Sequence, residues 1–313
     1  MSIYITIDGG TTYTRINLAK DRKIIASIKL DTGAYSNIEN GDLLKNKIKE
    51  AIDELLKSNS LKETDIVRIL ASGMITSEFG LCNLSHIEAP AGISELSSSA
   101  EEIHIKEISS IPFVFIRGVK IKSDSFENCD IMRGEETELM GIINKDYDKC
   151  VYILPGSHTK LIMTDNQGRI TNFQTMLTGE MIKALSQNTI LKDAVELGGL
   201  QINTSYLLKG YDYCLDEGIN KALFKVRILK NVFSCTKEEI YSFFMGVILC
   251  GEIDNIKNSD AKTVVIGGRA QMKNALSSIL NERTDKRVIT LSEEAVNAST
   301  VVGAIRIFEN DIL

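Results

Sequence analysis

The sequence is poor in the residue types that build histidine-based active sites. Its 313 residues include three histidines, three prolines and no tryptophan. A zinc site with three histidine ligands would need His86, His104 and His158 together, and no HExxH motif is present. A Ser-His-Asp triad could draw on only the same three bases. Chemistry that depends on histidine is therefore not expected.

Positive charge, long apolar runs and paired cysteines are also lacking. Lys and Arg number 36 against 42 Asp and Glu, a net charge of −6, whereas a nucleic-acid-binding protein shows a basic face. No stretch approaches the ~20 apolar residues of a membrane span. The six cysteines are dispersed without a CxxC pair, which is typical of reduced thiols. We expect a cytoplasmic protein whose partner is a small molecule, not a nucleic acid or a membrane, with a homodimer left open.

The hydrophobic pattern indicates an α/β protein. A chain of this length forms about two domains, and its 43% apolar and 25% charged residues are typical of globular proteins. Alternating or continuous apolar runs predict strands over 3–7, 14–19, 23–30, 66–71, 113–119, 150–154, 160–163, 263–266 and 288–290. Helical spacing predicts helices over 42–56, 133–144, 181–187, 193–208, 237–253, 271–280 and 295–308.

One arrangement occurs near the start of each half. A strand, a turn with glycine and threonine, and a returning strand begin at residue 3 and again at residue 150. An offset of 147 places Gly9 on Gly156 and Thr12 on Thr159. Two ordinary hairpins would give the same pattern, but both halves continue into strands and helices, which favours a repeated architecture. We therefore predict two closely joined domains, 1–145 and 146–313.

The turn Asp8-Gly9-Gly10-Thr11-Thr12 carries the strongest chemical signal. Glycine allows a close backbone approach, and exposed N–H groups and threonine hydroxyls suit phosphate oxygens. A carboxylate at a strand end suits hydrated Mg²⁺. A strand follows and no GK[ST] is present, so the turn is not a Walker loop. A plain glycine turn beside a surface aspartate is the competing interpretation.

Two further glycine turns are candidate nucleotide-binding loops. The turn 155–160 follows a strand as the first turn does, and two such hairpins can grip one polyphosphate. Gly267 and Gly268 lie where an apolar strand gives way to a helix, and ligands of open α/β sheets bind at this end of the strands. A nucleotide base could lie on these glycines, although a simple strand-to-helix turn explains them equally well.

An acidic segment follows Arg133. Carboxylates such as Glu135 and Glu136 in the first turn of a helix stabilise its positive end. They could also serve as a general base that takes a proton from a sugar hydroxyl as a phosphoryl group arrives, while Arg133 holds an anionic substrate. The polar segment Thr178-Gly179-Glu180 is by itself a helix cap.

The order of these motifs resembles the sugar-kinase/Hsp70/actin superfamily. The segments MRGEET (132–137), LPGSHTK (154–160) and MLTGE (176–180) together resemble the 2-dehydro-3-deoxygalactonokinase family, and 71–75 is similar to its AGM segment. The resemblance spans nearly the whole chain. It implies two ribonuclease H-like (actin-like ATPase) domains around a nucleotide cleft, an N-terminal domain for substrate and the first phosphate loop, and a C-terminal nucleotide-binding domain.

The implied reaction is ATP-dependent phosphorylation of 2-dehydro-3-deoxy-D-galactonate at its terminal hydroxyl. Asp8 would organise Mg²⁺, and Glu135, or else Glu136, would be the base. The resemblance also implies which residues contact the nucleotide: Gly9, Gly10, Thr11, Thr12, Gly156, Ser157, His158, Thr159, Gly267, Gly268 and Ala270. The residues that it implies for the sugar-acid substrate are Gly73, Met74, Arg133, Thr178 and Glu180.

Two alternatives stay open at this point. A kinase of the same superfamily could act on another sugar acid or polyol, and a non-catalytic nucleotide- or sugar-sensing protein could use the same fold. The presence of both Asp8 and Glu135 favours an enzyme, because a sensor does not need a metal-organising carboxylate and a base.

Overall fold

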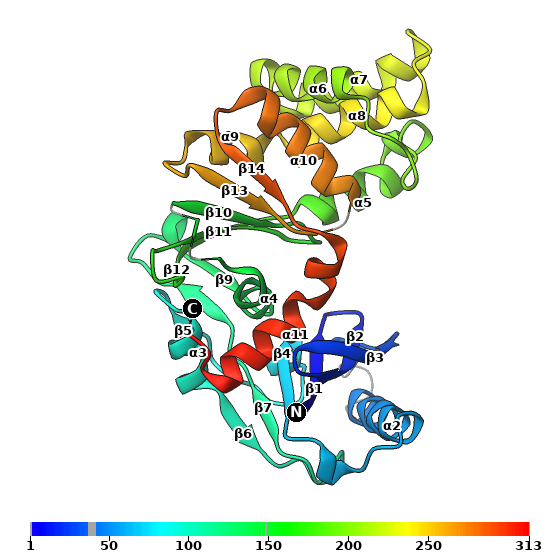
Figure 1. Ribbon diagram of the computed structural model, residues 1–313. Helices are drawn as coiled ribbons and strands as arrows, with labels where there is room; N and C mark the ends of the chain where they lie inside the picture. Colours follow the sequence, from blue (N-terminus) through cyan, green and yellow to red (C-terminus); the bar gives the residue numbers. More distant parts are fainter. Residues whose placement is uncertain (1, 37–41, 145, 148, 269, 313) are drawn as a thin grey trace. The chain divides into compact units, whose positions relative to one another are not determined.

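The structure is a computed structural model that describes residues 2–36, 42–144, 146–147, 149–268 and 270–312 (Figure 1). The chain divides into two compact units. The first unit consists of Met1–Asp146, Thr164–Asn172 and Glu294–Leu313, and the second consists of Tyr147–Met163 and Phe173–Glu293.

The first unit is built on a mixed sheet of six strands. Its strands are β1 (Ile3–Gly9), β2 (Thr14–Lys20), β3 (Lys23–Leu30), β4 (Ile69–Gly73), β6 (Glu101–Ile103) and β7 (Phe113–Phe115). Their order is β3-β2-β1-β4-β7-β6, with β1 antiparallel to β2 and parallel to β4. A small second sheet has the order β5-β8-β9 and is formed by β5 (Ile87–Glu88), β8 (Val119–Ile121) and β9 (Asp130–Met132).

The helices of this unit pack on its sheet through apolar side chains that recur at helical spacing and so lie on one face of the helix. In α2 (Leu43–Ser58), Leu44, Ile48, Ile52 and Leu55 share one face, are nearly inaccessible to solvent and belong to one core cluster with residues of β1 and β2. Among the described residues, the other helices are α3 (Ile93–Ser99), α4 (Glu135–Ile142) and α11 (Glu293–Glu309), with short 3₁₀ turns η1 (Glu63–Asp65), η2 (Met74–Thr76) and η3 (Phe126–Asn128).

The second unit has a five-stranded sheet and a group of helices. Its strands are β10 (Cys150–Leu154), β11 (Thr159–Thr164), β12 (Ile170–Met176), β13 (Thr263–Ile266) and β14 (Arg287–Thr290), in the order β12-β11-β10-β13-β14. Its helices are α5 (Thr178–Asn188), η4 (Ile190–Asp193), α6 (Thr204–Glu217), α7 (Ile219–Asn231), α8 (Lys237–Ile248), α9 (Cys250–Asn258) and α10 (Ala270–Arg283). The apolar α8 is buried along most of its length in the core.

The two sheets repeat one strand order, which confirms the α/β class and the repeated hairpin. In each, three antiparallel strands are followed by two strands parallel to the first one in the chain, as in ribonuclease H-like domains: β4 and β7 run parallel to β1, and β13 and β14 run parallel to β10. The first sheet adds β6, which is antiparallel to β7, at its edge. The fixed offset of 147 does not extend across the turns. Gly9 pairs with Thr14 in the first hairpin, whereas Leu154 pairs with Lys160 in the second, so the two turns differ in length.

Several element boundaries differ from those expected. The helix expected over 193–208 is wrong, because Gly198 and Gly199 adopt φ of +98° and +71°, which stops a helix there. The helix α6 begins later, where the Asn203 side chain accepts a hydrogen bond from Tyr206 N at 3.2 Å. The helix α7 was not expected, the strand expected over 113–119 is divided into β7 and β8, and the helix expected over 237–253 is divided into α8 and α9.

The last helix groups with the first unit, whereas we expected residues 146–313 to form one domain. Two glycines explain the close contact between α11 and α4. A Cβ atom at Gly303 would lie 1.8 Å from Thr137 O, and one at Gly141 would lie 1.9 Å from Ser299 O. Arg306 adds a hydrogen bond to Met140 O at 2.8 Å. No helix within the described residues is long and apolar enough to cross a membrane.

Candidate active site

Three carboxylates and one arginine interact at the end of β1. Asp8 is the penultimate residue of β1, and Glu135 and Glu138 lie three residues apart in α4. The negative charges of Asp8, Glu135 and Glu138 repel one another. Arg15 of β2 lies opposite Asp8 of β1 in the strand register. Burial raises the pKa of Asp8, Arg15 opposes this rise and Glu135 adds to it. This end of the sheet is therefore a concentration of negative charge with one cationic neighbour.

Three glycines allow the backbones of this region to approach closely. Gly73, which pairs with Gly9 between β4 and β1, has φ of +82°, and a Cβ there would lie 2.4 Å from Gly9 O. Gly134 precedes α4 with φ of +113°, and its Cβ would lie 3.2 Å from Gly73 Cα. The start of α4 is thus held against the ends of β1 and β4, and this contact brings Glu135 close to Asp8.

The two neighbouring glutamates of α4 have different environments. Glu136 is fully buried, and its carboxylate accepts hydrogen bonds from Gly134 N at 2.8 and 2.9 Å and from Thr137 Oγ1 at 3.0 Å. Burial raises the pKa of Glu136 to about 8, and the charge of Glu135 adds to the rise. Glu135 is half-buried and accepts a hydrogen bond from Arg133 N at 3.1 Å. Between the two candidate bases, the geometry favours Glu135.

Glu138 is a residue that the motif analysis missed. Burial raises its pKa to about 8, the charges of Asp8 and Glu135 add to the rise and Arg15 opposes it. The spacing of three residues between Glu135 and Glu138 is the signal that could have identified it, because such residues lie on one face of a helix.

Arg133 is occupied by contacts within the first unit. Its guanidinium donates hydrogen bonds to Thr76 O at 2.6 Å, Thr76 Oγ1 at 2.5 Å and Leu84 O at 2.9 Å, and lies 3.3 Å from His86 Nδ1. Burial lowers the pKa of His86 to about 4, and the charge of Arg133 adds to this effect. Arg133 therefore ties η2, which begins at Met74, to the segment that precedes α4.

The first glycine-threonine turn is partly satisfied by its own chain. Gly10 N donates to Tyr13 O at 2.8 Å, and the carbonyl groups of Gly10 and Thr11 accept hydrogen bonds from Ala34 N and Tyr35 N. Thr12 is exposed. The N–H of Gly10 is therefore already used within the chain, whereas the side chain of Thr12 is open to solvent.

The second turn is supported by the first turn of α5. Gly156, Ser157 and His158 are exposed, whereas Thr159 is buried at 1% exposure. Ser157 O accepts hydrogen bonds from the N–H groups of the second and third residues of α5, at 3.1 and 3.2 Å. His158 Nε2 lies 3.0 Å from Glu180 Oε1. Thr178 and Glu180, expected at the substrate, therefore lie beside the second turn and belong to the second unit.

The third glycine turn packs against the second turn. Gly268 has φ of +78°, and a Cβ atom there would lie 2.8 Å from Pro155 Cδ. Ala270 begins α10 and is exposed, whereas position 269 lies outside the described residues. A cavity of about 530 Å³ lies between α10 and the segment 200–204. It is lined by Leu200, Gln201, Ile202, Thr204, Gln271, Asn274, Ser277 and Ser278.

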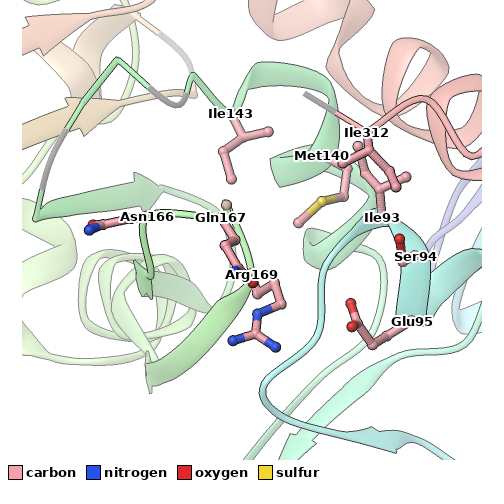
Figure 2. Close-up of a pocket in the computed structure, with 10 residues that line it drawn as sticks. Ile93, Ser94, Glu95, Met140, Ile143, Asn166, Gln167, Arg169 and Ile312 are labelled. Carbon is pink, nitrogen blue, oxygen red and sulfur yellow. The ribbon is translucent and has the colours of Figure 1, made fainter.

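A different cavity of the first unit contains none of the expected site residues. It measures about 480 Å³, and Figure 2 shows apolar side chains such as Met140 and Ile143 beside the charged Arg169 and Glu95. Both charged groups already have partners: Arg169 pairs with Asp165 at 2.8 Å, and Glu95 accepts a hydrogen bond from a backbone N–H.

The strand order of the two units defines the class of fold, which is the actin-like ATPase fold. A crystal structure from Sinorhizobium meliloti, provisionally assigned as a 2-dehydro-3-deoxygalactonokinase, matches with a TM-score of 0.79 over 97% of this chain and 98% of that chain, at 21% identity. The activator of 2-hydroxyisocaproyl-CoA dehydratase from Clostridium difficile, with bound ADPNP, matches with a TM-score of 0.51 over 98% of this chain and 95% of that chain, at 13% identity.

The family is established by the sequence itself. The family model described as 2-keto-3-deoxy-galactonokinase matches residues 8–302, so the chain belongs to this family of ATP-dependent sugar-acid kinases. The 2-dehydro-3-deoxygalactonokinase of Escherichia coli (strain K12) is 25% identical over 277 residues, which cover 84% of this chain and 85% of that protein.

Proposed function

We propose that this protein transfers the terminal phosphoryl group of ATP to the 6-hydroxyl of 2-dehydro-3-deoxy-D-galactonate. The products are 2-dehydro-3-deoxy-6-phosphogalactonate and ADP. The observation that carries the proposal is the closeness of Asp8 and Glu135 at the end of β1, in a chain of the 2-keto-3-deoxy-galactonokinase family. Each unit supplies part of what phosphoryl transfer needs, which is positioning, a base and compensation of charge.

Glu135 acts as the general base in this proposal. Its carboxylate is half-buried, and its hydrogen bond to Arg133 N fixes the side chain at the start of α4. A carboxylate in this position can take the proton of the substrate hydroxyl as the phosphoryl group arrives. Glu136 serves a structural role because its oxygens are used by Gly134 N and the Thr137 hydroxyl.

Within the described residues no three His, Cys, Asp or Glu side chains are grouped as a metal site, so a magnesium ion here would need phosphate and water oxygens in addition to carboxylates. Asp8 and Glu138 would hold it, since a magnesium ion in such sites uses one or two carboxylates together with substrate phosphates and water. Burial raises the pKa of both carboxyl groups, and the charge of Arg15 opposes the rise in each, so a divalent cation would relieve their repulsion. When bound, the ion would neutralise charge that develops on the phosphates.

The second unit supplies the nucleotide contacts. The exposed turn Gly156–His158 would face the phosphates, and Gly267, Gly268 and Ala270 would face adenosine. The neighbouring cavity of about 530 Å³ has a size that suits a nucleoside, and its amide side chains, such as Gln271 and Asn274, offer donors and acceptors to a base. In the first unit, Gly73 and Met74 would line the substrate side, with Arg133 fixing their position.

A coupled ADP-release assay with 2-dehydro-3-deoxygalactonate, its gluconate epimer and other sugar acids tests the substrate. The Glu135→Gln variant should lose about 10²- to 10⁴-fold in kcat while it still binds ATP, because general base catalysis contributes this much. Glu127→Gln, which changes an exposed carboxylate outside the site, is the matched control. Undiminished turnover of Glu135→Gln would refute the base, and the absence of ADP release with every sugar acid would refute the kinase assignment.

We further place the enzyme in the cytoplasm, because all six cysteines are free thiols. A homodimer stays a prediction, which a measurement of the mass in solution would test.

A further inference from the structure

A buried carboxylate of the second unit lies behind the second turn. Glu252 of α9 is 3% exposed, and its Oε1 accepts a hydrogen bond from the hydroxyl of Thr178, which is 2% exposed. Burial raises the pKa of Glu252, and the hydrogen bond from Thr178 opposes the rise. A buried carboxylate is costly unless it is hydrogen-bonded, so this contact stabilises both side chains in one arrangement.

Thr178 is the residue at which α5 begins, and the next two residues touch the second turn. The N–H groups of Gly179 and Glu180 both donate to Ser157 O, at 3.1 and 3.2 Å. A Cβ atom at Gly179 would lie 2.3 Å from Gly156 O, so the start of α5 and the turn are in direct backbone contact. A shift of Thr178 would move the turn with it.

We propose that Glu252 and Thr178 are positioning residues for the phosphate-binding turn of the second unit. Glu252 fixes the Thr178 hydroxyl, Thr178 fixes the first turn of α5, and the N–H groups of that turn hold Ser157 O. This inference rests on the proposed function, in which the exposed turn faces the phosphates of ATP. It also gives Thr178 a role other than the substrate contact expected from the sequence, because its hydroxyl is buried and engaged.

Three variants separate this role from general stabilisation. Thr178→Val keeps the shape of the side chain and removes its hydroxyl, Thr178→Ser keeps the hydroxyl, and Glu252→Gln keeps the volume and an acceptor oxygen but removes the charge. The control is Ser259→Ala, which removes a hydroxyl from the end of α9, where it donates to Ile256 O at 2.7 Å. Initial rates at varied ATP and varied sugar acid give the KM of each substrate.

We expect Thr178→Val to raise the KM for ATP about tenfold to a hundredfold, since displacement of a binding group by about 1 Å has effects of this size. Thr178→Ser should stay within about twofold of the wild type, Glu252→Gln should show a smaller rise, and the KM for the sugar acid should not change. An unchanged KM for ATP in Thr178→Val, or an equal rise for both substrates, would overturn the inference. If Thr178→Val does not fold, Glu252→Gln decides by the same criterion.

Nucleotide titration by calorimetry distinguishes failure of this inference from failure of the proposed function. If the wild type binds ADP but phosphorylates no sugar acid, the proposed function fails. The positioning role can still be tested in that case, because it requires ADP to bind more weakly to Thr178→Val than to Thr178→Ser. If the wild type is active and both variants bind ADP equally, only the positioning role fails.

Discussion

Substitution of Gly73 by alanine tests the close approach of backbones that brings Glu135 to Asp8. Gly73 has φ of +82° and ψ of −154°, a conformation that residues other than glycine adopt at a cost of about 1–3 kcal/mol. The new Cβ would also lie 2.4 Å from Gly9 O, and relief of such overpacking costs a further ~1–3 kcal/mol. The free energy of unfolding should therefore fall by about 2–6 kcal/mol, a large part of the ~5–15 kcal/mol that stabilises a typical protein.

The measurement is urea unfolding followed by circular dichroism, with a separate transition fitted for each unit where two are seen. Gly251→Ala is the matched control, because the new Cβ in α9 would meet no atom within 4 Å beyond its chain neighbours and the backbone of its own helix. Alanine in a helix should raise stability there by about 0.5–1 kcal/mol. If Gly73→Ala stays within about 0.5 kcal/mol of the wild type, which is the range of neutral surface changes, the argument from backbone contact is wrong.

Three further measurements follow from the structure. Gly303→Ala should destabilise the first unit by at least ~1–3 kcal/mol, because its Cβ would lie 1.8 Å from Thr137 O, and wild-type stability would contradict the contact between α4 and α11. The pKa of Glu136 is raised from 4.5 to about 8, so the folded state retains this proton and the wild type should lose stability as the pH rises from ~5 to 8. Glu136→Gln should lose less over the same range, because the raised pKa of Glu138 remains in the variant; a constant difference in unfolding free energy between the two proteins would refute the burial argument. Alkylation of the native protein followed by peptide mass analysis should modify the exposed Cys129 before the buried Cys150 and Cys250, because burial raises the pKa of Cys150, and a hydrogen bond with Cys214 together with burial raises the pKa of Cys250; the reverse order would refute this.

The sequence predicted the features that depend on neighbouring residues. The alternation of β1 and β2 around Asp8 and the apolar run of β13 before Gly267 are local patterns, and the structure has strands at these places. The helix expected over 193–208 does not form across its whole length, because Gly198 and Gly199 adopt positive φ although apolar residues recur around them. Glycines can stop a helix even where hydrophobic spacing continues.

The environment of each acidic side chain could not be read from the sequence. Glu135 and Glu136 are adjacent in the same motif. Only the folded structure shows that the Glu136 carboxylate accepts hydrogen bonds from Gly134 N, whereas Glu135 is half-buried. Thr178 and Glu252 lie 74 positions apart in the sequence, so no local sequence pattern predicts their hydrogen bond. The roles of these residues depend on burial and hydrogen bonding, which are properties of the fold.

The close packing of α11 on α4 also sets a delay during biosynthesis. The chain between Ile142, where α4 ends, and Glu293, where α11 begins, contains the whole of the second unit. At the usual synthesis rate of about 5–20 residues per second, its ~150 residues take about 8–30 s to make. During this interval the surface of α4 that receives Gly303 has no covering helix, so the first unit completes its fold after the second unit has been synthesised.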